Sequence, residues 1–91
     1  PTHKGIIISL YEQGISPSDI VLKTGHNQES VDRYIKVYDQ VLQLTRSDHS
    51  AESICEIIGR SMHTIRQYLR LLKNFHPELT VDVPEKEKNR S

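Results

Sequence analysis

Tryptophan is absent from this 91-residue sequence, which has one phenylalanine, one cysteine and no net charge. A lone cysteine, Cys55, cannot form a disulfide within the chain, which is typical of proteins from a reducing compartment. No aliphatic run is longer than Ile6-Ile7-Ile8, whereas roughly 20 apolar residues are needed to cross a membrane. Because a signal-peptide pattern is also missing, we expect a cytoplasmic protein without a membrane partner. Since the chain starts at Pro1 rather than at methionine, we expect it to be part of a longer protein.

Patterns typical of catalytic and metal sites are missing as well. The sequence has no glycine-rich phosphate loop and no recognisable set of nucleophile, base and orienting residue. Its histidines are too far apart to form a short metal-ligand pair; they are His3, His26, His49, His63 and His76. We therefore expect no catalytic residues, no metal, no cofactor and no small-molecule substrate, and we expect the chain not to be an enzyme.

The zero net charge hides an uneven distribution of 12 basic and 12 acidic residues. Between Gly59 and Pro77 there is no acidic residue, and the bases there are Arg60, Arg66, Arg70 and Lys73. The tail from Glu78 onward is slightly acidic. A strongly basic domain would indicate nucleic-acid binding directly, whereas here only one segment carries that signal.

The sequence repeats itself at a spacing of 34 residues. Superposing residues 14–38 on residues 48–72 aligns a serine, a glycine and an apolar framework. The aligned pairs are Ser16 with Ser50, Ile20 with Ile54, Gly25 with Gly59, Val31 with Ile65, Tyr34 with Tyr68, Ile35 with Leu69 and Lys36 with Arg70. Because these residue types cap helices, form turns and pack helix faces, we interpret the repeated segment as a helix-turn-helix folding unit.

Periodicity and capping residues predict an all-α protein with five helices, at about residues 4–13, 17–24, 28–45, 51–58 and 62–75. We expect Pro77 to end the last helix and no strand to form, since residues 80–83 have no obvious partner. The third helix has an apolar face without a break, formed by Val31, Tyr34, Ile35, Tyr38, Val41 and Leu42. This face predicts one continuous helix over residues 31–44, shared by the two repeats.

These elements predict a first helix-turn-helix unit at residues 4–46 and a second at residues 28–76, which share the helix at 28–45. The polar tail at residues 78–91 is expected to be disordered. Tetratricopeptide repeats have the same period, but they need two long helices per repeat and a tryptophan-containing pattern. We set them aside because the short helices here are about eight residues long and two repeats would be too few to stack.

The twice-occurring pattern S-x-x-x-I-x-x-x-x-G-x-[NS]-x-x-[ST]-[VI]-x-x-Y-[IL]-[KR] resembles the helix-turn-helix of resolvases, transposases and the promoter-reading region of sigma factors. The resemblance covers residues 4–75, and the tandem arrangement is similar to the C-terminal part of an uncharacterised, partly transposon-associated prokaryotic family. The pattern departs at Val21 and Cys55, where such proteins often have alanine.

The resemblance implies sequence-specific binding in the major groove of double-stranded DNA, by the recognition part of a larger prokaryotic transcription regulator or mobile-element protein. Arginine, glutamine and asparagine make bidentate contacts to base edges, and hydroxyls suit phosphate oxygens. In the second repeat, the implied DNA-binding residues are Arg60, Ser61, His63, Thr64, Arg66, Gln67, Arg70 and Lys73. In the first repeat they are Asn27, Gln28, Ser30, Arg33 and Lys36, but Glu29 and Asp32 would repel phosphates there. The second repeat is therefore the expected DNA reader.

Several features also have a simpler interpretation. Arg66 and Arg70 could form an ordinary solvated face, and Tyr34 and Tyr68 are expected to pack in the core together with Val31 and Ile65. Cys55 is expected to be an inert packing thiol. The alternative function is a protein-interaction or dimerisation module, since the same fold serves different functions. We expect its homodimer contact on the exposed aliphatic side chains Ile6, Ile8, Leu22 and Val37.

Overall fold

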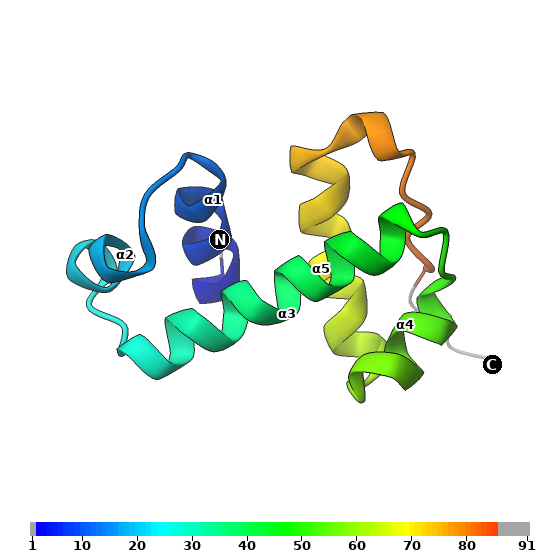
Figure 1. Cartoon of the computed structure of the whole chain (residues 1–91), viewed down its shortest axis with the longest axis horizontal. Helices are drawn as coiled ribbons and strands as arrows, with labels where there is room; N and C mark the ends of the chain where they lie inside the picture. Colours follow the sequence, from blue (N-terminus) through cyan, green and yellow to red (C-terminus); the bar gives the residue numbers. More distant parts are fainter. Residues whose placement is uncertain (1, 86–91) are drawn as a thin grey trace, which may run out of the picture. The chain divides into compact units, whose positions relative to one another are not determined.

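The computed structural model describes residues 2–85, which form five α-helices and one short 3₁₀ helix (Figure 1). The elements are α1 (His3–Glu12), α2 (Pro17–Thr24), α3 (Gln28–Arg46), α4 (Ala51–Ile58), α5 (Met62–Phe75) and η1 (Pro77–Leu79). Within residues 2–85 there is no strand, and residues 80–83 form none. The all-α prediction with five α-helices is confirmed, and the bounds of α4 and α5 agree with the prediction to the residue.

Side-chain caps determine where the helices begin. The hydroxyls of Ser16, Ser50 and Ser61 accept hydrogen bonds from the backbone N–H three residues later, at 3.1–3.2 Å. At the start of α3, Asn27 Oδ1 accepts from the Ser30 N–H at 2.7 Å. Each cap satisfies a backbone donor that has no partner inside its helix.

Left-handed glycines end the two short helices. Gly25 follows α2 with φ 76° and Gly59 follows α4 with φ 80°, and each glycine N–H bonds the carbonyl four residues earlier. Only three residues separate α2 from α3, and three separate α4 from α5. Glycine is favoured here because its missing Cβ removes the steric penalty of positive φ.

Helix α3 runs without interruption from Gln28 to Arg46, which confirms the predicted continuous helix over residues 31–44. The chain divides into two compact units, an N-terminal unit (Pro1–Gln40) and a C-terminal unit (Val41–Ser91). The division lies inside α3, so this helix contributes residues to both units.

The core of the N-terminal unit consists of aliphatic residues from α1, α2 and α3 together with Tyr38. Its fully buried side chains are Ile7, Ile8, Ile20, Val31 and Tyr38. Two predictions are wrong here: Ile8 is 0% exposed and Val37 is 4% exposed, although both were expected on the surface. A third is wrong in degree, because Tyr34 is half-buried, with the Lys4 Nζ 5.7 Å and the Arg33 Cζ 5.3 Å from its ring centroid.

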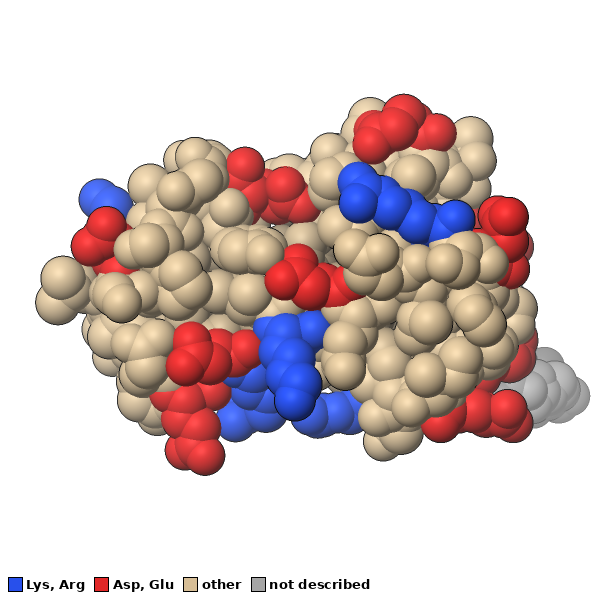
Figure 2. Space-filling model, in the orientation of Figure 1, with Lys and Arg blue, Asp and Glu red and all other residues tan. Residues whose placement is uncertain are grey.

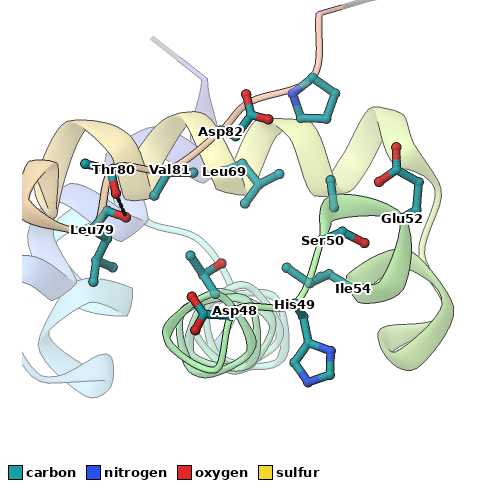
Figure 3. A pocket seen from close by; sticks show the side chains of 13 residues that line it. Asp48, His49, Ser50, Glu52, Ile54, Leu69, Leu79, Thr80, Val81 and Asp82 are labelled. Carbon is teal, nitrogen blue, oxygen red and sulfur yellow. Dashed lines mark hydrogen bonds between the residues drawn. The ribbon is translucent and has the colours of Figure 1, made fainter.

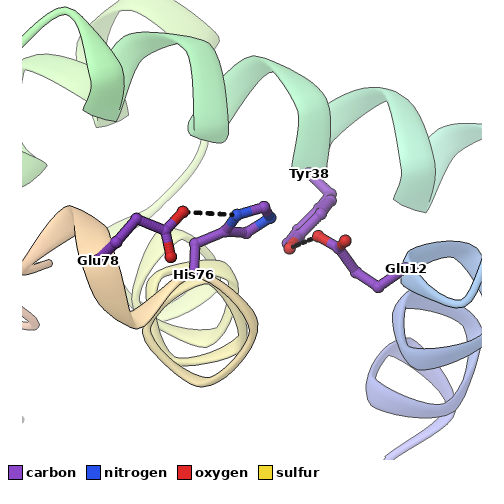
Figure 4. Close-up of polar contacts among 4 residues, drawn as sticks. All are labelled: Glu12, Tyr38, His76 and Glu78. Carbon is purple, nitrogen blue, oxygen red and sulfur yellow. Dashed lines mark hydrogen bonds and ion pairs between the residues drawn. The ribbon is translucent and has the colours of Figure 1, made fainter.

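Two tyrosine–carboxylate hydrogen bonds join α1 to α3. The Tyr11 hydroxyl donates to Asp39 Oδ2 at 2.8 Å, and the Tyr38 hydroxyl donates to Glu12 Oε2 (Figure 4). The Tyr11 and Tyr38 rings meet edge to face, with centroids 6.2 Å apart. The hydrogen bond to Asp39, followed by burial, raises the pKa of Tyr11 to about 12, because both favour the protonated phenol. Burial and the hydrogen bond to Glu12 likewise raise the pKa of Tyr38.

The core of the C-terminal unit is formed by the end of α3, by α4 and α5, and by the segment after α5. Its buried hydrophobic residues are Val41, Ile54, Ile65, Tyr68, Leu69, Leu72 and Val81, which confirms the predicted burial of Ile65 and Tyr68. Cys55 is half-buried, with its Sγ 4.0 Å from the Met62 Sδ, and burial raises the pKa of its thiol. The thiol is thus protonated near neutral pH, which suits a packing role.

The tail was expected to be disordered from Glu78 onward, and for residues 78–85 this expectation is wrong. Residues 77–79 form η1, His76 Nδ1 lies 3.3 Å from Glu78 Oε2 (Figure 4), and Val81 is 8% exposed. A hydrogen bond from the backbone N–H of Glu78 to its own carboxylate lowers the pKa of Glu78, and the interaction with His76 lowers it further. An apolar side chain at position 81 anchors the segment, which its polar composition did not indicate. Residues 86–91, the rest of the expected tail, lie outside the described residues.

Candidate nucleic-acid interface

The basic residues of the C-terminal unit are concentrated on α5 and the turn before it. Arg60 lies in the turn, and Arg70 and Lys73 lie on the helix; all three are exposed. The sequence from Gly59 to Pro77 contains no aspartate or glutamate. The segment is therefore a local source of positive potential within a chain of zero net charge.

Polar side chains with hydrogen-bonding capacity occupy the first two turns of α5. Ser61 and His63 are exposed, and Thr64 and Gln67 are half-buried. The Ser61 hydroxyl caps the helix through the Thr64 N–H at 3.2 Å, and His63 Nε2 lies 3.4 Å from Gln67 Nε2. Hydroxyl, imidazole and amide groups at a helix N-terminus can bind phosphate oxygens and base edges.

Arg66 does not lie where the sequence placed it. It was expected on the exposed face of α5, but it is 8% exposed, and its Nε–H donates to the Pro84 carbonyl at 3.1 Å. The helical periodicity alone does not account for this burial, because the group bonded to Arg66 comes from the segment after η1. Of the eight residues implied in the second repeat, Arg66 is the one that the structure buries.

The start of α3 carries the five residues implied in the first repeat, and its charges are mixed. Asn27, Gln28, Arg33 and Lys36 are exposed, and Ser30 is half-buried. Some of these groups are engaged, since Asn27 caps the helix and Gln28 Nε2 donates to Asp32 Oδ1 at 2.9 Å.

Acidic side chains share this part of α3. Glu29 and Asp32 are both exposed. On the face drawn in Figure 2, blue Lys and Arg side chains are interspersed with red Asp and Glu side chains. A polyanion would therefore meet repulsion at the start of α3 that α5 does not present.

A pocket of about 380 Å³ lies in the C-terminal unit between the α3–α4 turn, α5 and the segment after η1 (Figure 3). Its polar lining includes Asp48, Glu52 and Asp82, and its apolar lining includes Ile54 and Leu69. The Thr45 hydroxyl, which also lines it, is buried and has no hydrogen-bond partner among residues 2–85. Sequence reasoning missed this pocket, because no local pattern indicates that the residues after α5 pack back against it.

Neither a metal-binding cluster nor a membrane-spanning helix occurs within residues 2–85. No group of three or more His, Cys, Asp or Glu side chains is placed where it could hold a metal ion. No helix in the same range is both long and apolar enough to cross a bilayer.

Exposed apolar side chains are few and scattered. Leu22 on α2 is 81% exposed, Ile57 on α4 is 55% exposed and Ile6 on α1 is 38% exposed. Of the four aliphatic residues expected on the surface, Leu22 and Ile6 are exposed. Ile57 is also exposed, although the sequence analysis did not single it out.

One protein-family model matches residues 1–71, and its description is "Protein of unknown function (DUF1670)". The chain therefore belongs to the DUF1670 family. The matched range includes α1 to α4 and most of α5. No curated protein and no solved structure matches the chain.

Proposed function

We propose that this member of the DUF1670 family binds double-stranded DNA through two helix-turn-helix units, with α5 as the main recognition helix. The observation that carries the proposal is the exposed, acid-free basic segment on α5 and its preceding turn. A three-residue turn containing a left-handed glycine joins α4 to α5, which is the connection typical of helix-turn-helix motifs.

Within this proposal the residues of α5 divide by role. Ser61, His63 and Thr64 lie at the helix N-terminus, where they suit phosphate and base-edge contacts. Gln67 and Arg70 lie one and two turns further along and suit base edges, whereas Lys73 near the helix end suits a phosphate.

The first repeat has a smaller role in the proposal. Residues 16–36 have the same serine cap, short helix and left-handed glycine as residues 50–70, which supports treating both as the same kind of unit. Its recognition helix would be the start of α3, where Glu29 and Asp32 weaken attraction to phosphates. We place the whole segment in a larger prokaryotic regulator or mobile-element protein, as the resemblance implies.

A salt titration tests the proposal directly. The full chain is titrated against a fluorescently labelled random duplex, and anisotropy is read between about 50 and 200 mM salt, the range over which phosphate contacts weaken strongly. We expect measurable binding at the low-salt end and a linear fall of log affinity with log salt. The slope should be roughly −0.9 for each phosphate contact.

Arg70→Ala and Lys73→Ala should both weaken binding, and Lys23→Ala on α2 is the matched control. Lys23 is also an exposed base, but it lies in the last turn of the short helix rather than on a recognition helix. Absence of duplex binding by the wild-type chain at low salt would refute the proposal. Equal losses for all three variants would assign the binding to net charge alone.

A protein-interaction module is the second candidate, and the exposure of Leu22 and Ile57 supports it. Sedimentation of the chain at micromolar concentration tests it. If an apolar contact joins two copies, Leu22→Ser or Ile57→Ser should shift the dimer toward monomer. A strictly monomeric wild-type chain would count against the homodimer.

A further inference from the structure

Arg66 is a buried base on the helix to which we assign DNA recognition. Its side chain is 8% exposed, whereas Arg60, Arg70 and Lys73 are exposed. Burying a guanidinium is costly unless it is hydrogen-bonded, and here the Nε–H donates to the backbone carbonyl of Pro84 at 3.1 Å. The covering group comes from residues 80–85, which we call the strap.

The strap, rather than the helix geometry, explains this burial. Position 66 aligns with position 32 in the 34-residue repeat, and Asp32 is exposed on α3. The same place on a recognition helix is thus open in the N-terminal unit and closed in the C-terminal unit. One difference between them is the hydrogen bond to Pro84, which comes from outside residues 50–70.

The strap has one buried side chain, and its other residues are half-buried or exposed. Val81 is its buried anchor at 8% exposure, and Thr80 before it has the positive φ of 48°, which is unfavourable for a β-branched residue. Figure 3 shows Thr80, Val81 and Asp82 on the strap beside Leu69 of α5, around the pocket of about 380 Å³. Part of the strap lines this pocket instead of packing against a helix, so it buries less apolar surface than a core element.

We infer that the strap withholds Arg66 from the duplex and that its release strengthens DNA binding by α5. This regulation rests on the proposed function, because it concerns the same helix. A released Arg66 adds a guanidinium to the basic segment of α5, where it can contact a phosphate or a guanine edge. In the docked state the same charge is directed at a backbone carbonyl instead.

The test is a set of variants of the full chain titrated with the same labelled duplex at two salt concentrations. Val81→Ser removes the apolar anchor, and Pro84→Gly loosens the strap without touching Val81, in case the first variant fails to fold. We expect each to bind about tenfold more tightly, the gain typical of one arginine contact. The salt slope should steepen by about one unit if that contact is to a phosphate.

The matched controls use Arg66→Ala and Arg70→Ala as backgrounds. The gain from Val81→Ser should disappear when Arg66 is alanine, because the group it frees is missing. It should persist when Arg70 is alanine, because Arg70 is exposed with or without the strap. A gain retained without Arg66 would overturn the inference, and so would a loss in both backgrounds.

A second readout does not depend on DNA. In the wild-type chain the Arg66 Nε–H should exchange slowly with solvent in NMR spectra, because it is buried and hydrogen-bonded. The exchange should become fast in Val81→Ser and in Pro84→Gly. Fast exchange in the wild type would overturn the docked strap itself.

Slow exchange without duplex binding by any variant would refute the proposed function and the regulation built on it. Wild-type binding that neither strap variant strengthens would refute the regulation alone.

Discussion

Ile65 and Arg66 are adjacent on α5 and both are buried, but different forces bury them. Ile65 is 0% exposed and belongs to the apolar face that packs inside the C-terminal unit. Arg66 is covered by the strap and compensated by one hydrogen bond to Pro84. The first burial stabilises the fold through the hydrophobic effect, whereas the second is close to neutral, since the cost of desolvating the charge offsets the contact.

Truncation of Ile65 should therefore destabilise the chain strongly. Ile65→Ala removes buried methyl groups and leaves a cavity, so we expect the free energy of unfolding to fall by about 2–5 kcal/mol. Urea denaturation followed by circular dichroism measures this change. Ile57→Ala is the control: Ile57 is 55% exposed, so its loss should stay within about 0.5 kcal/mol. Equal losses at both positions would contradict the core assignment.

Tyr11 gives the N-terminal unit a sensitivity to alkaline pH. Its pKa is raised to about 12, first by the hydrogen bond to Asp39, so the folded state holds the phenol proton more tightly than the unfolded state does. The resulting stabilisation is complete below the ordinary tyrosine pKa of 10 and is lost as the pH rises from there through 12. The free energy of unfolding should fall over this window, and it should fall less steeply in Tyr11→Phe. Urea denaturation across that pH range measures both, and identical curves for the two proteins would exclude this role for Tyr11.

At the residue scale, sequence reasoning succeeded where burial follows a helical stripe and failed elsewhere. Val31 and Ile65 lie on such stripes and are buried as expected. Ile8 was expected among the exposed aliphatic side chains, yet it is 0% exposed, as is its neighbour Ile7. The burial of Arg66 depends on a segment 18 residues further along the chain, which no local pattern indicates.

At the scale of the elements, local signals were sufficient to place helix ends. Serine or asparagine caps begin four of the helices, and left-handed glycines end α2 and α4. These contacts join residues three or four apart, so they are encoded next to the ends that they define. The strap has no such encoding, because its hydrogen bond to α5 joins residues 18 apart in the sequence.

In the turn before α5, Gly59 is favoured by its backbone conformation and not by a lack of space for a side chain. Gly59 has φ 80°, and a Cβ placed there would meet no atom within 4 Å, so a substitution adds conformational strain without a clash. Gly59→Ala should therefore lower the free energy of unfolding by about 1–2 kcal/mol. Gly59→Asn should cost less, since asparagine tolerates this conformation better. Thermal unfolding compares the two, and an alanine variant as stable as the wild type would show that the turn does not need a left-handed residue.

At the scale of the whole molecule, 12 bases and 12 acids cancel, so long-range attraction cannot bring the chain to DNA. Under the proposed function, association relies on where the charges lie, and the two proposed recognition helices differ in this respect. Helix α5 has no acidic residue, whereas α3 places the exposed Glu29 and Asp32 beside its first turns. The distribution, rather than the sum, determines which unit a polyanion approaches.

Neutralising the acids of α3 measures whether the N-terminal unit approaches the duplex at all. Glu29→Gln with Asp32→Asn preserves shape, and an asparagine oxygen can still accept from Gln28, whose Nε2 lies 2.9 Å from Asp32 Oδ1. If α3 lies near the phosphates, non-specific affinity at low salt should rise by more than the change in net charge explains. The matched control is Glu52→Gln with Glu56→Gln on α4, which removes two exposed acids from a helix that is not assigned to recognition. Fluorescence anisotropy at two salt concentrations compares the two pairs. A larger gain from the α3 pair places both units on the DNA, whereas equal gains restrict recognition to α5, because net charge alone then accounts for the effect.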